Sequence, residues 1–392
     1  MENRLGLRFF KTLLTNMKRP LKILQVIPTL GQGGAERLVV ELSRYLQTRG
    51  HQVKIIIFRN ENQYADLCTN LNIQVIPSKV SYSLSRRHVI ETAEFDRSVS
   101  EFSPDIIHSH LVEAELVSRH TIHPKITYYT HWHGCHPVAD PFKLSDVFSK
   151  TAWWNLLQHK RLIRQYAVSK TQFICISNFI SSYLQRVFPF PEQRFHTIYN
   201  GGNPNTADVE KKHAEKTVQL VSLGRLAPFK NQLFLLKVAE ALIDQNVSNF
   251  HLSFVGDGPS ASELKALTKQ AGIEEWVTFL GHVKQPEKVL ANADILIHST
   301  INEAFGMALV EAMSCGMPVV AFRSGGIPEI VENGKDGFLV EPNDLDSFTE
   351  KVKQLIENAD LRNQFAANAI ERSKAFSMRS FVKNVEALYL EK

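Results

Sequence analysis

Two glutamates, Glu303 and Glu311, lie on either side of a segment whose backbone can bind an anion. Residues 299–321 are expected to form a loop, a helix and a strand, because helix-tolerant residues follow a glycine turn and Gly316 ends the helix. The backbone N–H groups at the helix start have no partner inside the helix and can bind a phosphate group. These groups belong to Gly306, Met307 and Ala308, directly after Phe305. A carboxylate beside a phosphate is repelled unless it faces neutral hydroxyl groups, so the segment predicts a ligand with a diphosphate between two sugars, a nucleotide sugar.

The spacing of the two glutamates alone would also fit a helix with two solvated side chains. Its context is a strand, a glycine turn, a helix, a Gly-x-Pro segment and a second strand. This order resembles the EX7E element of retaining glycosyltransferases of the GT-B fold, especially those of glycosyltransferase family 4. The resemblance implies that Glu303 contacts the transferred sugar and that Glu311 contacts the ribose. Ala304 stands where the family often has glycine, a small change that leaves these roles in place.

Two basic residues, Arg225 and Lys230, lie five positions apart across a proline-containing turn between a strand and a helix. Cations at the carboxyl end of a strand can bind a diphosphate, the arginine through its planar fork and the lysine as a point charge. Such a pair is often only a surface feature, but this spacing also resembles the diphosphate clamp of family 4. The resemblance further implies contacts to the nucleobase from two turns. The first turn contains Gly256, Asp257 and Gly258, and the second contains Val283.

Histidines are concentrated in two segments, DIIHSH at residues 105–110 and THWHGCH at residues 130–136. Family 4 has a histidine after the second of these strands, near the transferred sugar and the acceptor. The resemblance assigns this role to His133, which precedes a glycine, with His131 as the second candidate. A neutral imidazole there can form a hydrogen bond with a sugar hydroxyl. The cluster could also bind a metal, but no acidic or cysteine partner stands at a familiar ligand spacing, and His108 and His110 are explained more simply as structural residues.

A glycine-rich turn, TLGQGGAERL, follows the first strand at residues 29–38. Gly33 and Gly34 suggest a dinucleotide-binding loop, but Glu36 occupies the place of the third glycine in that pattern. The turn instead resembles the first loop of the GT-B amino-terminal domain, which implies a position near the donor phosphates and the acceptor.

Strands and helices alternate along the chain, which predicts doubly wound parallel sheets with ligand sites beyond the carboxyl ends of the strands. The expected strands of the first half are residues 21–28, 53–58, 73–76, 106–108, 126–130, 173–176 and 195–198. A chain of 392 residues exceeds the usual size of one core, so two domains are expected. With the resemblance, the predicted fold is GT-B: α/β, with two Rossmann-like domains that face each other across a cleft.

The predicted domain boundaries follow composition. Residues 1–20 form a basic, amphipathic extension that could lie on an anionic membrane surface or be a frayed terminus. Residues 21–203 form the acceptor domain, residues 204–217 a polar linker, and residues 218–375 the nucleotide-sugar domain. Residues 376–392 form a terminal helix that, by resemblance, is expected to return to the first domain.

The bulk composition limits the possible classes. A formal charge of +5 is too small to indicate a nucleic-acid partner. The four cysteines are far apart without a C-x-x-C motif, which fits a reducing compartment, and no apolar run is long enough to span a membrane. We therefore expect a cytoplasmic protein, with peripheral attachment to the inner face of the plasma membrane if residues 1–20 bind lipid. The D-x-D sequence at residues 344–346 is interpreted as a helix N-cap at Asp344 rather than a metal site.

The expected function is a retaining transfer of a hexose from a nucleoside-diphosphate donor to a hydroxyl of a glycan or lipid-linked acceptor, in polysaccharide or lipopolysaccharide synthesis. No cofactor or metal is expected, because Arg225, Lys230 and the helix start can stabilise the leaving diphosphate. The alternatives are a GT-B nucleotide-sugar epimerase, a non-catalytic carbohydrate-binding protein and, least favoured, an NAD-dependent oxidoreductase.

Overall fold

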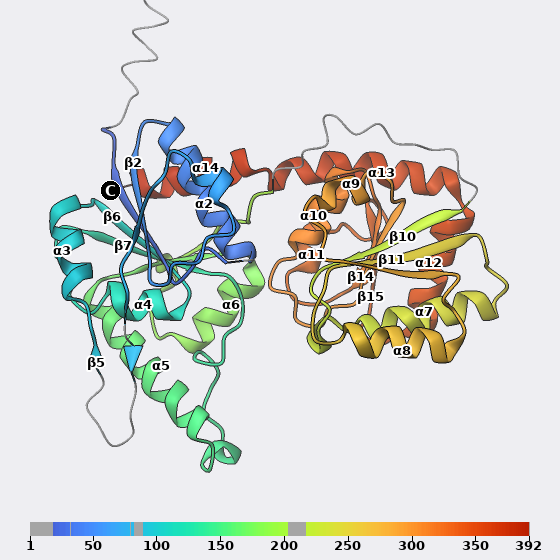
Figure 1. Cartoon of the computed structure of the whole chain (residues 1–392), viewed down its shortest axis with the longest axis horizontal. Coiled ribbons are helices and arrows are strands. Elements are labelled where there is room, and N and C mark those ends of the chain that lie inside the picture. Colours follow the sequence, from blue (N-terminus) through green and yellow to red (C-terminus); the bar gives the residue numbers. More distant parts are fainter. Residues whose placement is uncertain (1–18, 32, 79, 82–88, 203–216, 392) are drawn as a thin grey trace, which may run out of the picture. The chain divides into compact units, whose positions relative to one another are not determined.

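The computed structural model describes residues 19–391, apart from residues 32, 79, 82–88 and 203–216 (Figure 1). The chain divides into two compact units. Unit 1 contains Met1–Cys175, Ser181–Ile198 and Val382–Lys392, and unit 2 contains Ile176–Ile180 and Tyr199–Phe381. Residues 176–180, 199–202 and 376–381 therefore group with unit 2, whereas the sequence placed the first two segments in the acceptor domain and the third in the terminal helix. Most of the amphipathic extension and of the linker lies outside the described residues.

Unit 1 is built on a parallel sheet of seven strands in the order β3-β2-β1-β6-β7-β8-β9. The strands are β1 (Lys22–Ile27), β2 (Gln52–Ile57), β3 (Asn72–Val75), β6 (Ile106–His110), β7 (Thr127–Trp132), β8 (Gln172–Cys175) and β9 (Phe195–Thr197). A short antiparallel hairpin, β4 (Val80–Ser81) and β5 (Val89–Ile90), was not predicted. All seven predicted strands of this unit occur, within a few residues of their predicted bounds.

Helices cover both faces of the sheet in unit 1. Side chains of α2 (Gly34–Thr48) pack on β1 and β2, and α14 (Met378–Leu390) lies on the same face against β6 and β7. The other face carries α4 (Val112–Ser118), with α5 (Lys150–Val168) beside it (Figure 1). The remaining helices are α3 (Ala93–Phe102), α6 (Asn178–Val187) and the short η1 (Ala65–Cys68), η2 (Leu144–Asp146) and η3 (Glu192–Arg194).

Unit 2 is built on a parallel sheet of six strands in the order β12-β11-β10-β13-β14-β15. The strands are β10 (Val218–Leu223), β11 (Phe250–Val255), β12 (Val277–Gly281), β13 (Ile295–His298), β14 (Val319–Phe322) and β15 (Gly337–Val340). The helices are η4 (Pro228–Lys230), α7 (Gln232–Asp244), α8 (Ala261–Ala271), α9 (Pro286–Leu290), α10 (Met307–Ser314), α11 (Ile327–Ile330), α12 (Leu345–Glu357), α13 (Ala359–Ser373) and η5 (Lys374–Phe376).

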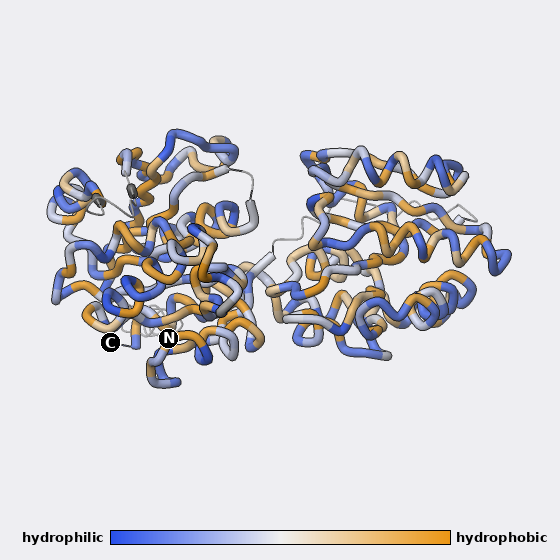
Figure 2. The backbone as a smooth tube through the Cα atoms, turned by 90° about the horizontal axis from the view of Figure 1, so that it is seen from below, coloured by the Kyte–Doolittle hydropathy of each residue, from blue (hydrophilic) through white to orange (hydrophobic). Residues whose placement is uncertain are grey.

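Apolar side chains of α7, α8 and α12 pack on one face of this second sheet and form the core of unit 2. In each unit the apolar stretches of the chain run through the interior strands, while the helices alternate between apolar and polar residues (Figure 2). Two parallel, doubly wound sheets confirm the predicted fold class, because their interior strands are buried on both sides.

Two local predictions can also be checked. The side chain of Asp344 caps α12 by accepting a hydrogen bond of 3.0 Å from the Ser347 amide, which confirms the N-cap interpretation of the D-x-D sequence. None of the helices in the described parts of the chain is both long enough and apolar enough to cross a bilayer.

Candidate active site

Glu303 lies in the loop between β13 and α10 and is held by two basic side chains. Lys230 Nζ donates a hydrogen bond of 2.6 Å to Glu303 Oε2, and His298 Nε2 lies 3.3 Å from the same oxygen. Burial alone would raise the pKa of Glu303, but the contacts to His298 and Lys230 outweigh it and lower the pKa to about 2. The carboxylate is therefore ionised at neutral pH, and its other oxygen, Oε1, makes neither of these contacts.

The backbone around Glu303 is fixed by the loop that follows β14. The amide of Gly326 donates to the Glu303 carbonyl at 2.8 Å, and the Asn302 amide donates to Ser324 Oγ at 2.7 Å. Gly325 has a φ of +56°, and a Cβ atom there would lie 2.0 Å from the Glu303 carbonyl oxygen. Only glycine allows this close approach, so this loop sets the position of the glutamate.

Helix α10 begins as the sequence predicted. Gly306 is its N-cap, in the left-handed conformation with a φ of 110°, and its carbonyl accepts hydrogen bonds from the amides of Leu309 and Val310. The amides of residues 306–308 precede these first helical donors and form the N-terminal end of the helix dipole. Phe305 is buried, whereas Met307, Ala308 and Glu311 are half-buried.

Three turns at the carboxyl ends of β10, β11 and β12 pack tightly together. The Leu226 amide donates to the Asp257 carbonyl at 3.0 Å, and the Gly256 amide donates to the Gly281 carbonyl at 2.9 Å. A Cβ atom would lie 2.0 Å from a backbone oxygen at Gly256 and 2.2 Å from one at Gly258. The structure thus brings the predicted nucleobase turns together beside Arg225, whose side chain is exposed, with the half-buried Val283 two residues beyond Gly281.

In unit 1, His133 belongs to a stack of four histidines. His133 Nε2 lies 3.1 Å from His110 Nδ1, and its ring stacks on that of His131 with 4.4 Å between centroids. Desolvation lowers the pKa of His133 to about 4, so the imidazole is neutral at neutral pH. His108 completes the stack, and its ring lies parallel to that of His131.

Three of these histidines, His108, His110 and His131, place one nitrogen each within 4.8 Å of one another, which is the pattern of a possible metal site. His110 already has both ring nitrogens in hydrogen bonds, and Nδ1 of His108 lies 2.6 Å from the Tyr389 hydroxyl. These hydrogen bonds involve both nitrogens of His110 and one nitrogen of His108.

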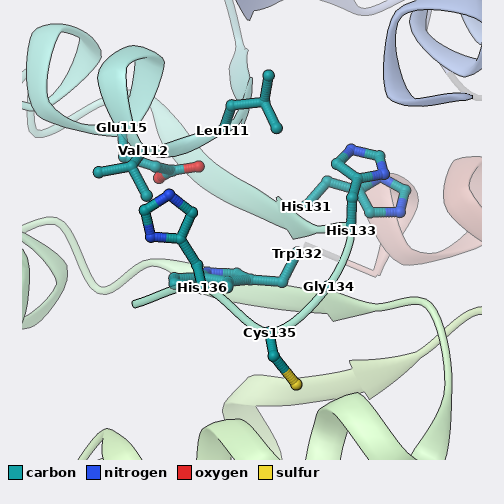
Figure 3. Close-up of a pocket in the computed structure, with 9 residues that line it drawn as sticks. All are labelled: Leu111, Val112, Glu115, His131, Trp132, His133, Gly134, Cys135 and His136. Atoms are coloured by element: carbon teal, nitrogen blue, oxygen red, sulfur yellow. The ribbon is translucent and has the colours of Figure 1, made fainter. Parts of the chain in front are cut away.

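A pocket of about 230 Å³ opens between the start of α4 and the loop after β7 (Figure 3). Its walls are mostly apolar. They are formed by Leu111, Val112, Glu115, His131, Trp132, His133, Gly134, Cys135 and His136. Glu115 is buried, turns its carboxylate toward this space and forms an ion pair of 2.8 Å with Arg119. Desolvation raises the pKa of Glu115 to about 7.

The glycine-rich turn of unit 1 agrees less well with its predicted role. Gly33 is the N-cap of α2, but a Cβ atom there would lie 2.0 Å from Glu36 Oε2, so the glutamate side chain covers this glycine. Nothing lies within 4 Å of a Cβ atom at Gly34, so its surroundings do not require a glycine. A carboxylate over Gly33 disfavours a phosphate contact in this arrangement.

Two family models match the chain. The model for glycosyl transferases group 1 matches residues 205–372, and that for glycosyltransferase family 4 matches residues 32–206. The chain belongs to the group 1 glycosyltransferases.

Curated relatives of this glycosyltransferase differ in how much they share with it. N-acetyl-alpha-D-glucosaminyl L-malate synthase of Bacillus anthracis is 33% identical, over 36% of this chain and 37% of its own length. The chain thus matches little more than a third of that relative. An uncharacterized glycosyltransferase of Haemophilus influenzae is 23% identical over 90% of this chain and 94% of its own length.

Solved structures share the fold of this glycosyltransferase over nearly all of both chains. Alr3699/HepE of Anabaena, in complex with UDP and glucose, is 21% identical with a TM-score of 0.75 and covers 95% of this chain and 100% of its own. WaaG, a glycosyltransferase involved in lipopolysaccharide biosynthesis, is 16% identical with a TM-score of 0.72 and covers 94% and 100%. The fold is therefore GT-B.

Several residues of this glycosyltransferase site were not predicted. His298 ends β13 and contacts Glu303, and its place in the strand before the glutamate loop was a usable signal. Gln25 lies in a buried strand and contacts His110 at 2.8 Å, but nothing in its sequence context marks it. Glu115 and Arg119 have helical spacing, although only the structure shows that both are buried.

Proposed function

We propose that this glycosyltransferase moves a hexosyl group from a nucleoside-diphosphate donor to a hydroxyl group with retention of configuration and without a metal ion. The observation that carries the proposal is the contact of Lys230 and His298 with one oxygen of Glu303, next to the N-terminus of α10. An ionised carboxylate beside a positive helix end suits a ligand with hydroxyl groups next to a diphosphate.

The proposed roles follow from charge and position. The start of α10, Lys230 and Arg225 stabilise the negative charge that develops on the leaving diphosphate, by preorganised electrostatics. Glu303 binds hydroxyl groups of the transferred sugar through Oε1, and Glu311 binds the ribose. The acceptor hydroxyl attacks on the face of the leaving group, and a phosphate oxygen receives its proton, because Glu303 is committed to Lys230 and His298.

Unit 1 is proposed to bind the acceptor. His133 offers a neutral imidazole to a hydroxyl group, and the pocket in front of Glu115 can hold part of a glycan or lipid-linked acceptor. Transfer onto a polysaccharide or lipopolysaccharide intermediate is supported by the similarity to WaaG. A cytoplasmic location, with residues 1–20 against an anionic membrane surface, remains part of the proposal, and liposome flotation with and without these residues tests it.

The test measures sugar transfer by the full chain. Nucleoside diphosphates and NDP-sugars are first screened by thermal shift, since a bound donor or its nucleotide product raises the apparent stability. With the donor so found, Glu303→Ala and Lys230→Ala are each expected to lower turnover by about 100-fold or more, the scale seen when one preorganised group is removed. The control is Glu371→Gln, because Glu371 forms an exposed ion pair with Lys374. Product NMR should show an anomeric configuration equal to that of the donor.

Unchanged turnover in both variants would remove the active-site assignment. Inversion at the anomeric carbon would contradict the retaining mechanism, and full loss of activity with EDTA would contradict metal independence. Isomerisation of the donor without transfer would favour the epimerase alternative.

A further inference from the structure

A line of hydrogen bonds crosses the sheet of unit 1 and ends at His133. Gln25 of β1 and His110 of β6 are both fully buried, and Gln25 Oε1 lies 2.8 Å from His110 Nε2. The other nitrogen of His110, Nδ1, lies 3.1 Å from His133 Nε2. The strands β1, β6 and β7 are neighbours in the sheet, and this order brings the three side chains together at one end.

The protons in this line follow from the chemistry of its members. At the inner end of the line, the carbonyl oxygen of Gln25, Oε1, is the atom that faces His110 Nε2.

A carbonyl oxygen can only accept a hydrogen bond, so His110 Nε2 must carry a proton. Burial lowers the pKa of His110 well below its usual value, so the ring is neutral and its Nδ1 carries a lone pair. That lone pair accepts from His133 Nε2, which therefore carries the proton of the neutral His133 ring. The remaining nitrogen of His133, Nδ1, is then an acceptor.

We propose that Gln25 and His110 are positioning residues that hold His133 as the Nε2–H tautomer, so that its Nδ1 accepts a hydrogen bond from a hydroxyl group of the bound carbohydrate. The second half of this inference rests on the proposed function, whereas the tautomer does not. A site built in this way recognises a hydrogen-bond donor on the carbohydrate. It therefore selects a free hydroxyl group over a methoxy or fluoro group at the same position.

The direct test is NMR of the histidine rings in the full chain labelled with ¹⁵N. Long-range ¹H–¹⁵N correlations identify the protonated nitrogen of each ring, and His133→Gln assigns the His133 signals. We expect wild-type His133 to be protonated at Nε2 and His110 at Nε2. A His133 ring protonated at Nδ1 overturns the proposal without any variant, as does a change in the His110 signals on adding EDTA, which would reveal an ion in place of the hydrogen bonds.

The variant Gln25→Met removes the carbonyl acceptor while keeping a side chain of similar length. His110 and His133 are then expected to become mixtures of both tautomers, and kcat to fall about three- to tenfold, the effect of losing one hydrogen bond of about 1 kcal/mol. His108→Gln is the matched control, because His108 lies on the same face of β6 but donates nothing to His133, and it should leave the His133 tautomer unchanged.

The outcomes separate the two ideas. A His133 ring that stays wholly Nε2–H in Gln25→Met overturns the positioning role, whatever the turnover. A tautomer shift with unchanged kcat overturns the contact with the carbohydrate hydroxyl. Loss of donor turnover in Glu303→Ala tests the proposed function separately, since Glu303 lies in unit 2.

Discussion

At the scale of single residues, the site depends on carboxylates and imidazoles that are kept in one protonation state. Glu303 is kept ionised by two basic neighbours, and His133 is kept neutral by desolvation. The position of the Glu303 backbone depends on a close approach that only a glycine at position 325 allows. Gly325 therefore contributes to the site together with the charged groups.

Gly325→Ala tests this dependence. The new Cβ atom would lie 2.0 Å from the Glu303 carbonyl oxygen, so the loop of Glu303 must move. We expect a loss of stability clearly above the roughly 1–2 kcal/mol of a left-handed alanine, together with loss of nucleotide binding. Urea unfolding measures the first effect, and thermal shift with the nucleoside diphosphate found by the screen measures the second.

The control for this prediction is Gly334→Ala. Gly334 also has a positive φ, +78°, but nothing lies within 4 Å of a Cβ atom there. Gly334→Ala should lower the stability only by the strain of the left-handed backbone and should leave nucleotide binding intact. Equal effects of the two substitutions would show that the close approach to Glu303 does not matter.

Single residues were predictable where a local pattern carries the chemistry. The glycine turn before α10 and the cap at Asp344 were readable from neighbouring residues, and both occur. The contact of Gln25 with His110 was not, because it joins residues 85 positions apart through the strand order. Nothing local in the sequence records which strands become neighbours.

At the scale of secondary-structure elements, α14 completes unit 1. Glu386 of this helix is buried and accepts hydrogen bonds of 2.6 Å from Arg49 Nε and 3.0 Å from His51 Nε2. Tyr389 and the Leu388 carbonyl contact β6 and β7. The alternation of strands and helices was enough to predict the elements, but the partners of this terminal helix came only from the resemblance.

Glu386→Ala should destabilise unit 1 by about 1–3 kcal/mol, because it leaves the buried His51 Nε2 without its acceptor and removes the ion pair with the exposed Arg49. Burial raises the pKa of Glu386, but the bonds from Arg49 and His51 outweigh it and lower the pKa below the ordinary value of 4.5. The stabilisation is therefore present above that value and disappears as the pH falls through the lowered pKa. Urea unfolding at neutral pH measures the loss.

The matching control is Glu371→Ala on α13. Glu371 forms an exposed ion pair with Lys374, so its removal should cost less than about 1 kcal/mol. A similar small loss for Glu386→Ala would mean that α14 is held by its apolar contacts alone.

At the scale of the whole molecule, the two units should respond differently to acid. In the described part of the chain, the pKa of six histidines of unit 1 is lowered chiefly by burial. They are His108, His110, His133, His136, His159 and His196. Below pH 6.5 the unfolded chain binds more protons than the folded unit 1, whose buried histidines stay neutral. The free energy of unfolding of unit 1 therefore falls. Glu115 acts in the opposite sense, because its raised pKa of about 7 lets the folded state bind a proton first.

The six histidines outnumber the two glutamates of unit 1 whose pKa is raised by burial, Glu36 and Glu115, which predicts a net loss of stability. The loss is about 1.4 kcal/mol per pH unit for each fully shifted histidine. Calorimetry at pH 7.5, 6.5 and 5.5 should show one transition that falls steeply. A nucleoside diphosphate found by the thermal-shift screen is expected to raise only the other transition, because the proposed donor site lies in unit 2. If the nucleotide-sensitive transition fell as steeply with pH, the buried histidines would not be the cause.

The route of the chain through the two units has a consequence for biosynthesis. Unit 1 needs residues 382–392, which leave the ribosome only after every residue of unit 2. Unit 2 can thus finish folding before unit 1. Until residues 382–392 are synthesised, the sheet of unit 1 lacks the helix that covers β6 and β7. Nascent chains stalled before residue 382 should consequently recruit chaperones through unit 1.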